Sequence, residues 1–355
     1  MTEDFTVLPD LASRDLGGSV VDASDELFAE KENLIKPAPP GFAPGDFGSR
    51  GKVYDGWETR RRREPGHDHA IVRLGRPGIV HGVVVDTSFF RGNYPAEISV
   101  EAACADGYPA PAELAGAGWH TLVGRSAVSG DSQNSYPVAD RRRWTHLRLS
   151  IYPDGGVARL RVHGEVVPDP AFMTGTIDLA ALENGGRVTG CSDAFYSPPE
   201  HLIMPGLARV TSDGWENARR RGPGNDFVEV RLAAPGVIRY VEIDTSCFVG
   251  NAPGWVILSA ASSAGGGSDV SPPDVGPPDA SSGAGPEWPP ILPRTRVQPD
   301  TRHRFLIDSA PEADRVRLDV LPDGGLARLR VYGEVTPAAA ESLRERWERT
   351  APDGN

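Results

Sequence analysis

The stretch LRLSIYPDGGVARLRVHGEV, which covers Leu147–Val166, decides the fold class of the chain. It contains two runs with an apolar residue at every second position, separated by Pro-Asp-Gly-Gly. This alternation is typical of a strand that has one buried face and one wet face. Glycine supplies the positive φ that a tight turn requires. We therefore predict a hairpin between strands at Thr145–Tyr152 and Val157–Val162, within an antiparallel sheet.

The same stretch occurs a second time, as VRLDVLPDGGLARLRVYGEV at Val316–Val335. Two further motifs repeat in the same order: Asp-Gly-Trp-Glu at Asp55–Glu58 and Asp213–Glu216, and Asp-Thr-Ser at Asp86–Ser88 and Asp244–Ser246. The offset is 158 residues for both of these motifs and 169 residues at Pro-Asp-Gly-Gly, so the copies differ in loop length. The repeat is the size of a domain, which excludes a solenoid of short repeats.

The two copies predict the domain organisation. The first β-sandwich repeat covers residues 1–168, the second covers residues 183–337, and a helix and tail form residues 338–355. Residues from about 261 to 290 are rich in Ser, Gly, Pro and Asp, and we interpret them as a disordered surface insertion, because such a composition buries little apolar area. We expect an all-β chain of two tandem homologous, jelly-roll-like antiparallel β-sandwiches with a short C-terminal helix. The other predicted strands are His69–Leu74, Ile79–Asp86, Glu97–Ala102, Phe227–Leu232, Val237–Ile243, Val256–Leu258, Arg315–Leu321 and Leu326–Val331.

The composition excludes several classes of protein. The chain has 355 residues, with 37 Lys and Arg against 49 Asp and Glu, so its formal net charge is −12. We expect no nucleic-acid partner, because phosphate binding needs a basic surface. No apolar run reaches the ~20 residues of a membrane span, and the first residues lack the apolar segment of a signal peptide. Three widely spaced cysteines predict neither a disulfide framework nor a zinc site. We expect a soluble, cytoplasmic protein that has no contact with a membrane.

The first cluster of candidate site residues is DGWETRRRR, residues 55–63. Arginine presents a fixed fork of donors that fits a carboxylate, so Arg60 and Arg61 are candidates for binding an anionic ligand, with Glu58 as an acid or base. The alternative is a solvated charge run that pairs with nearby carboxylates. Trp57 is interpreted as a core residue, because a large aromatic side chain is most often buried.

The second cluster is the loop that follows the apolar strand ending at Asp86. Asp86, Ser88 and Asn93 bring a carboxylate, a hydroxyl and an amide into one loop, and such groups can orient a polar ligand. The alternative is a turn in which the Asp and Asn side chains bond their own backbone.

The third cluster is His67-Asp68-His69. His67 is a candidate proton carrier, because the unperturbed pKa of histidine is about 6.5. His67 and His69 would share one face of a strand, as two ligands of a metal site do, but the sequence shows no third ligand. His163 aligns with Tyr332 of the second copy and is interpreted as a packing residue.

These motifs resemble the allantoicase (allantoate amidinohydrolase) family over nearly the whole chain. The resemblance rests on DLASRDLGG at Asp10–Gly18, KVYDGWETRR at Lys52–Arg61, GHD at Gly66–Asp68 and VDTSFFRGNYP at Val85–Pro95. It implies two tandem jelly-roll sandwiches. It also implies an enzyme that hydrolyses allantoate to ureidoglycolate and urea during the degradation of allantoin and purines.

The resemblance also suggests roles for the candidate residues. Allantoate carries a carboxylate and two ureido groups on one carbon, so its site must hold an anion, transfer protons and orient ureido groups. The predicted catalytic residues are Glu58, His67 and Asp86, and the predicted substrate-binding residues are Arg60, Arg61, Ser88 and Asn93. We expect a small-molecule ureide substrate, no cofactor and a homo-oligomer, and the sequence leaves a role for a divalent metal open.

The second copy lacks several of these groups. Ala218 replaces Arg60, Asn225 replaces His67 and Val249 replaces Arg91. This favours a site centred on the first copy, although a site at the interface of the copies fits the sequence equally well. Two other functions stay open. One is a non-enzymatic tandem β-sandwich that binds a ligand or carbohydrate, because a fold does not determine a function. The other is an enzyme that acts on a related ureide.

Overall fold

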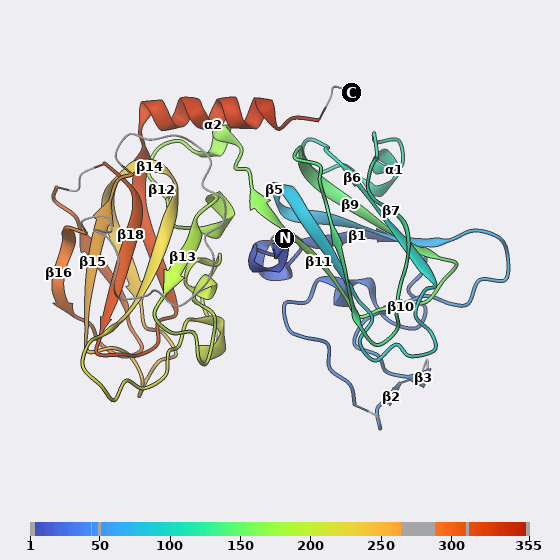
Figure 1. The fold of residues 1–355 in the computed structure, drawn as a ribbon, viewed down its shortest axis with the longest axis horizontal. Coiled ribbons are helices and arrows are strands. Elements are labelled where there is room, and N and C mark those ends of the chain that lie inside the picture. Colours follow the sequence, from blue (N-terminus) through green and yellow to red (C-terminus); the bar gives the residue numbers. More distant parts are fainter. Residues whose placement is uncertain (1–3, 44, 49–50, 264–287, 310–311, 353–355) are drawn as a thin grey trace. The chain divides into compact units, whose positions relative to one another are not determined.

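Two β-sandwich units make up the chain in the computed structural model, which describes residues 4–43, 45–48, 51–263, 288–309 and 312–352 (Figure 1). The first unit consists of Met1–Val167 and Arg346–Asn355, and the second of Pro168–Glu345. The predicted insertion at about 261–290 lies mainly outside the described residues. β15 ends at Ala261 and β16 begins at Pro290.

The first unit is built almost entirely from strands, as the alternating sequence predicts. Its short helices are the 3-10 turns Phe5–Val7, Arg14–Leu16 and Lys31–Ile35 and the α-helix α1 (Pro111–Leu114). Its strands are β1 (Ser19–Ala23), β2 (Phe47–Gly48), β3 (Gly51–Lys52), β4 (Trp57–Glu58), β5 (Asp68–Asp86), β6 (Glu97–Ala103), β7 (His120–Ala127), β8 (Gln133–Pro137), β9 (Arg143–Tyr152), β10 (Gly156–Val157) and β11 (Arg159–Val166).

The second unit repeats this plan. Its strands are β12 (Ile177–Asp178), β13 (Arg187–Cys191), β14 (Asp226–Asp244), β15 (Trp255–Ala261), β16 (Pro290–Arg296), β17 (Arg302–Leu306), β18 (Glu312–Leu321) and β19 (Arg328–Val335). Its 3-10 turns are Pro170–Phe172, Leu182–Asn184, Pro199–Ile203 and Thr211–Asp213, and the predicted C-terminal helix is α2 (Pro337–Arg349). None of the helices in the described ranges has the length and apolar character needed to cross a membrane.

One long strand organises each unit. The predicted strands His69–Leu74 and Ile79–Asp86 are the two halves of the single strand β5, and the register shifts between Arg73 and Gly78. The first half pairs with β1 and β9, and the second half pairs with β11 and β8. β14 makes the corresponding pairs in the second unit.

The predicted hairpin at Pro-Asp-Gly-Gly is wrong, although the turn itself is present. Gly155 and Gly324 have φ values of 144° and 131°, as the turn requires. However, β9 pairs with the first half of β5 and β11 with its second half, so the strands on either side of the turn do not pair with each other. Alternation shows that each strand has one buried face, but it does not identify the neighbouring strand.

The core of each unit contains one tryptophan from the repeated Asp-Gly-Trp-Glu motif. Trp57 and Trp215 are both fully buried, which confirms their interpretation as core residues. Each indole Nε1 donates a 2.8 Å hydrogen bond to a backbone carbonyl, that of Asp25 in the first unit and Asp193 in the second. The polar atom is therefore satisfied while the ring is removed from water.

Candidate active site

Five side chains lie on one face of the sheet formed by β8, β5 and β11. On β11, Leu160 and Val162 are buried in the core, so the alternate residues Arg161 and His163 lie on the opposite face. Arg161 is directly opposite Val84 of β5, and Asp86 of β5 is opposite Gln133 of β8. Directly opposed residues share a face, and so Val84, Asp86 and Gln133 join Arg161 and His163.

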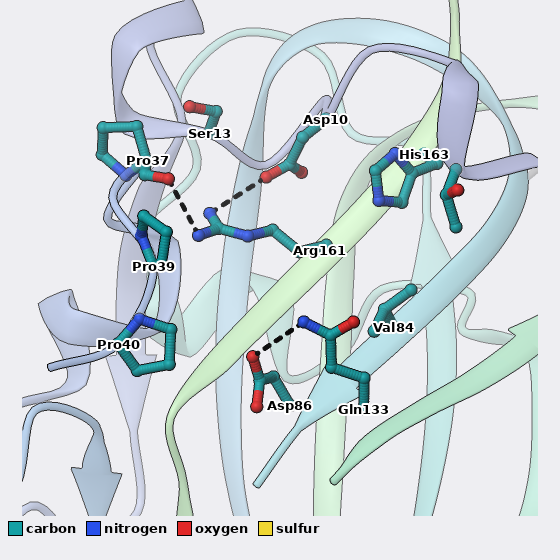
Figure 2. A pocket seen from close by; sticks show the side chains of 11 residues that line it. Asp10, Ser13, Pro37, Pro39, Pro40, Val84, Asp86, Gln133, Arg161 and His163 are labelled. Atoms are coloured by element: carbon teal, nitrogen blue, oxygen red, sulfur yellow. Dashed lines mark hydrogen bonds and ion pairs between the residues drawn. The ribbon is translucent and has the colours of Figure 1, made fainter. Parts of the chain in front are cut away.

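Two other segments close over this face and leave a cavity of about 420 Å³ (Figure 2). This volume falls in the range of small-molecule sites, about 300–1,000 Å³. The covering residues come from the N-terminal segment (Thr6, Asp10 and Ser13) and from a proline-rich loop (Pro37, Pro39 and Pro40).

Arg161 is the cation of the cavity. Its Nη1 lies 3.3 Å from Oδ2 of Asp10, and its Nη2 donates to the carbonyls of Pro37 and Ala38 at 3.1 and 3.3 Å. Figure 2 shows Arg161 reaching between Asp10 and Pro37. The guanidinium therefore connects both covering segments to the sheet.

Asp86 is the predicted catalytic residue that lines this cavity. Its side chain is nearly fully buried at the end of β5. Its Oδ1 accepts a 2.8 Å hydrogen bond from the backbone N–H of Ser88, and its Oδ2 lies 3.5 Å from Nε2 of Gln133. One oxygen is thus firmly held, and the other has only a long contact with Gln133 (Figure 2).

Glu58 and Asn93 are brought together, but neither lines the cavity. Nδ2 of Asn93 donates a 2.7 Å hydrogen bond to Oε1 of Glu58. Burial raises the pKa of Glu58, and the hydrogen bond from Asn93 acts in the opposite direction. The same pair recurs in the second unit as Asn251 and Glu216. In both copies the pair therefore connects the Asp-Gly-Trp-Glu motif to the loop that follows the long strand, β5 or β14.

The arginine run is partly committed to ion pairs. Nε of Arg60 contacts Asp25 at 2.6 Å, and Nη1 of Arg62 contacts the buried Asp68 at 2.7 Å. Arg61 is exposed to solvent. The structure thus shows charge pairing in this segment, and it does not bring Arg60 or Arg61 into the cavity.

His67 is exposed immediately before β5, and its ring centroid lies 4.9 Å from that of Tyr152. Nε2 of His69 lies 3.7 Å from Oδ2 of Asp22. Across the ranges that the structure describes, no three His, Cys, Asp or Glu side chains come together as a metal site would require. His163, interpreted from sequence as a packing residue, instead lines the cavity, and its Nδ1 lies 2.7 Å from the carbonyl oxygen of Leu8.

The equivalent face of the second unit carries larger and more charged side chains. Glu242 stands where Val84 does, and its carboxylate pairs with Arg302 at 2.5 Å and with Arg304 at 2.8 Å. These arginines replace Gln133 and Ser135 of the first unit, since β17 pairs with β14 in the register in which β8 pairs with β5. In addition, Tyr240 and Tyr332 stack with their ring centroids 4.5 Å apart, where the first unit has Gly82 and His163.

Asp86 is the one residue of the cavity lining that sequence reasoning named as a site residue. Four polar or charged residues that it did not name are Asp10, Gln133, Arg161 and His163. Two of them had a visible signal, because Arg161 and His163 occupy alternate positions between buried residues of β11. Asp10 lies in the DLASRDLGG motif, but nothing in that motif indicates that it contacts Arg161. Gln133 belongs to β8, which was not among the predicted strands.

The comparisons with known proteins agree on one family. The family model described as "Allantoicase repeat" matches residues 9–167 and 177–336. A relative from Nocardia farcinica named "Probable allantoicase" is 54% identical over 335 residues, covering 93% of this chain and 95% of the relative. "Allantoicase" of Dictyostelium discoideum is 39% identical, covering 91% and 86%. The crystal structure of allantoicase from Saccharomyces cerevisiae superimposes with a TM-score of 0.75 at 30% identity and covers 92% of each chain.

Proposed function

The chain belongs to the allantoicase family and is a hydrolase that acts on allantoate, and from this premise we propose that the cavity of the first unit is its active site. The reaction converts allantoate and water to ureidoglycolate and urea. In it, the bond from the central carbon to one ureido nitrogen breaks and a carbon–oxygen bond forms. The leaving nitrogen gains a proton, and the water loses one.

One observation carries the assignment of the site to the first unit. The two copies share the strand register, yet Val84, Gln133 and His163 replace Glu242, Arg302 and Tyr332. In the second unit, these positions hold an ion pair and a tyrosine stack. In the first unit, smaller or uncharged side chains surround a cavity that contains one buried carboxylate and one guanidinium.

Asp86 and His163 are the groups we propose for proton transfer. The free lone pairs of Asp86 Oδ2 suit a base that takes a proton from the attacking water. The carbonyl of Leu8 can only accept a hydrogen bond, so Nδ1 of His163 carries a proton and Nε2 is left to bind and release a second one. His163 then protonates the departing urea nitrogen. The sequence left the acid and base roles open among Glu58, His67 and Asp86.

The other predicted site residues stay predictions. The raised pKa of Glu58 suits a general acid, although Glu58 does not line the cavity. Asn93 would then keep the carboxyl group oriented. Ser88 supports Asp86 through its backbone N–H. Arg60, Arg61 and His67 lie on exposed segments, where a substrate would be more hydrated.

The test is urea release from allantoate by the purified protein, with Asp86→Asn as the main variant. General-base catalysis contributes about 10²–10⁴-fold, so we expect a loss of kcat of this order, and we expect a smaller loss for His163→Gln. Asp244→Asn is the matched control, because Asp244 ends β14 and accepts the same 2.8 Å hydrogen bond from the backbone of Ser246. Equal loss in both Asp variants would contradict a site in the first unit.

We also propose that the protein acts in the cytoplasm as a homo-oligomer and without a bound cofactor. Cys104, Cys191 and Cys247 are all free thiols, which suits a reducing compartment. The family resemblance supports the oligomer. Cell fractionation tests the compartment, and light scattering of the purified protein tests the assembly. Urea release after treatment with a chelator tests the independence from metal.

A further inference from the structure

We infer that Arg161 holds the substrate carboxylate, so that the cavity selects small carboxylates with a ureido arm over uncharged ureides. This inference rests on the proposed active site. It differs from the sequence-based expectation, which gave this role to Arg60 or Arg61.

The donors of Arg161 are only partly used within the protein. Its two hydrogen bonds to backbone carbonyls come from Nη2, and its contact with Asp10 comes from Nη1. A guanidinium has five N–H donors, so Nε and one hydrogen of Nη1 have no hydrogen-bond acceptor among the described residues. These donors belong to a side chain that lines the cavity.

Asp10 orients Arg161 without neutralising it fully. Its Oδ1 accepts hydrogen bonds from the backbone N–H groups of Ala12 and Val162, at 3.1 and 2.9 Å. Only Oδ2 faces Arg161, at 3.3 Å. A closed pair in the same unit looks different: Nε and Nη2 of Arg148 both contact one oxygen of Glu101, at 2.9 and 2.7 Å.

The neighbouring arginine of β11 does not compete for this role. Arg159 is fully buried, and its Nε, Nη1 and Nη2 all donate, to the carbonyls of Ala38 and Asp55 and to the Asp55 carboxylate among others. Arg60 is also committed, because its Nε contacts Asp25 at 2.6 Å, and its side chain is 63% exposed. An ion pair with a ligand is weaker in such an exposed position, because water screens it.

The rest of the cavity fixes the direction of the ligand. A carboxylate bound at Arg161 is attracted there and repelled by Asp86. The ureido arms of the ligand then face Asp86 and Gln133. The Asp86 carboxylate accepts hydrogen bonds from ureido N–H groups, and the side-chain amide of Gln133 donates one to a ureido oxygen. This orientation brings the central carbon between the anion-binding group and the proposed base.

The second unit offers a matched control at Arg330. Arg330 occupies the position of Arg161 in its strand, its Nη1 lies 3.6 Å from Asp178, and its Nη2 donates to the carbonyls of Met204 and Gly206. Replacing either arginine by glutamine thus removes similar structural contacts. Only the Arg161 variant changes the proposed carboxylate site.

The experiment measures the binding of two probes by calorimetry. Hydantoate (N-carbamoylglycine) has the carboxylate and one ureido arm of the substrate, and N-carbamoylglycinamide is its uncharged counterpart. We expect wild-type protein and the Arg330→Gln variant to bind hydantoate about 10- to 100-fold more tightly than the amide, the range of a hydrogen bond to a charged group. We expect Arg161→Gln to bind both probes equally weakly.

A preference for hydantoate that survives in Arg161→Gln, or that disappears equally in Arg330→Gln, would overturn the inference. Circular dichroism of both variants checks that they fold. If the wild-type protein shows the preference but releases no urea from allantoate, the cavity fails as an active site while the carboxylate site stands. If it releases urea and the preference does not depend on Arg161, the activity stands and this inference fails.

Discussion

Replacing Arg159 by methionine should destabilise the first unit in a way that depends on pH. Arg159 is 1% exposed and donates five hydrogen bonds, one of them at 2.6 Å to Oδ2 of Asp55. Methionine keeps the apolar stem but leaves four carbonyl bonds and the ion pair unmade. Breaking a buried ion pair by removing one partner costs about 3–5 kcal/mol. We expect a loss of about 3 kcal/mol at pH 7, because Asp55 keeps Lys36 and the backbone N–H of Gly41 as partners.

The pH-dependent part of this loss follows from Asp55. Burial alone would raise its pKa, but hydrogen bonds from Arg159, Gly41 and Lys36 lower the pKa from 3.8 to about 2. Such a shift corresponds to about 2.4 kcal/mol without screening. The side chain of Asp55 is 27% exposed, and Gly41 and Lys36 remain as its partners in the variant, so we expect the loss of Arg159 to remove about 1 kcal/mol of this stabilisation. Since the folded pKa is the lower one, this stabilisation is present above pH 3.8 and is lost as the pH falls toward 2.

The assay is guanidinium unfolding followed by circular dichroism, for wild type and variant, at pH 7, 5 and 3. The difference in unfolding free energy between wild type and Arg159→Met should be constant from pH 7 to 5. At pH 3 it should be smaller, because about half of the contribution that depends on the ionisation of Asp55 is lost. The control is Arg159→Met in an Asp55→Asn background, because the titrating carboxyl group is then absent and the effect of Arg159→Met should not change with pH. A difference for Arg159→Met that does not change down to pH 3 would refute the role of the Asp55 pair.

Four other perturbations test separate parts of the account. If Glu58 is the general acid, kcat of the wild type falls as the pH rises above the raised pKa of Glu58. Glu58→Gln should remove this decrease at high pH and lower kcat about 10²–10⁴-fold, whereas Glu216→Gln should do neither. A pH profile that is unchanged in Glu58→Gln would exclude the role. Val84→Glu combined with Gln133→Arg introduces the ion pair of the second unit, so urea release should stop while circular dichroism stays unchanged; retained turnover would place the site elsewhere. A Cβ at Gly156 would lie 2.0 Å from Phe90, so Gly156→Ala should cost about 1–3 kcal/mol of unfolding free energy, and Gly325→Ala a similar amount; no loss in either would mean that the rings move freely. Burial lowers the pKa of His146 to about 4, and Arg73 acts in the same direction. The unfolding free energy of the wild type should therefore decrease by about 1 kcal/mol for each unit by which the pH falls from 6.5 to 4, and His146→Gln should remove this slope. The same slope in both proteins would disprove the assignment of this pH dependence to His146.

The sequence predicted the sandwich class and the duplication because these depend on local patterns. Alternation within β9 and β11 identifies a buried face, and the repeated motifs identify equivalent positions. The strand pairing depends on which segments meet in space. This is why the Pro-Asp-Gly-Gly turn was correctly placed while its hairpin was not.

The site was predictable only in part, for a related reason. Asp86 was singled out because the loop after an apolar strand brings a carboxylate, hydroxyl groups and an amide together. The role proposed for Arg161 rests on its contact with Asp10, which is 151 residues away in the chain, and with carbonyls of the loop that begins at Pro37. Neither contact follows from spacing along one strand.

The duplication gives this protein an internal comparison that separates structural from functional residues. Pairs that recur with the same geometry serve the fold in both units: Arg62 with Asp68 and Arg220 with Asp226 hold the same loop to the same strand. Positions that keep the backbone register but change chemistry are different. The neutral Val84 of the first unit corresponds to the charged Glu242 of the second, although the strands on either side pair in the same register. We interpret this change as a consequence of the active site proposed for the first unit, because Val84 lines the cavity and a glutamate at this position would carry charge into it.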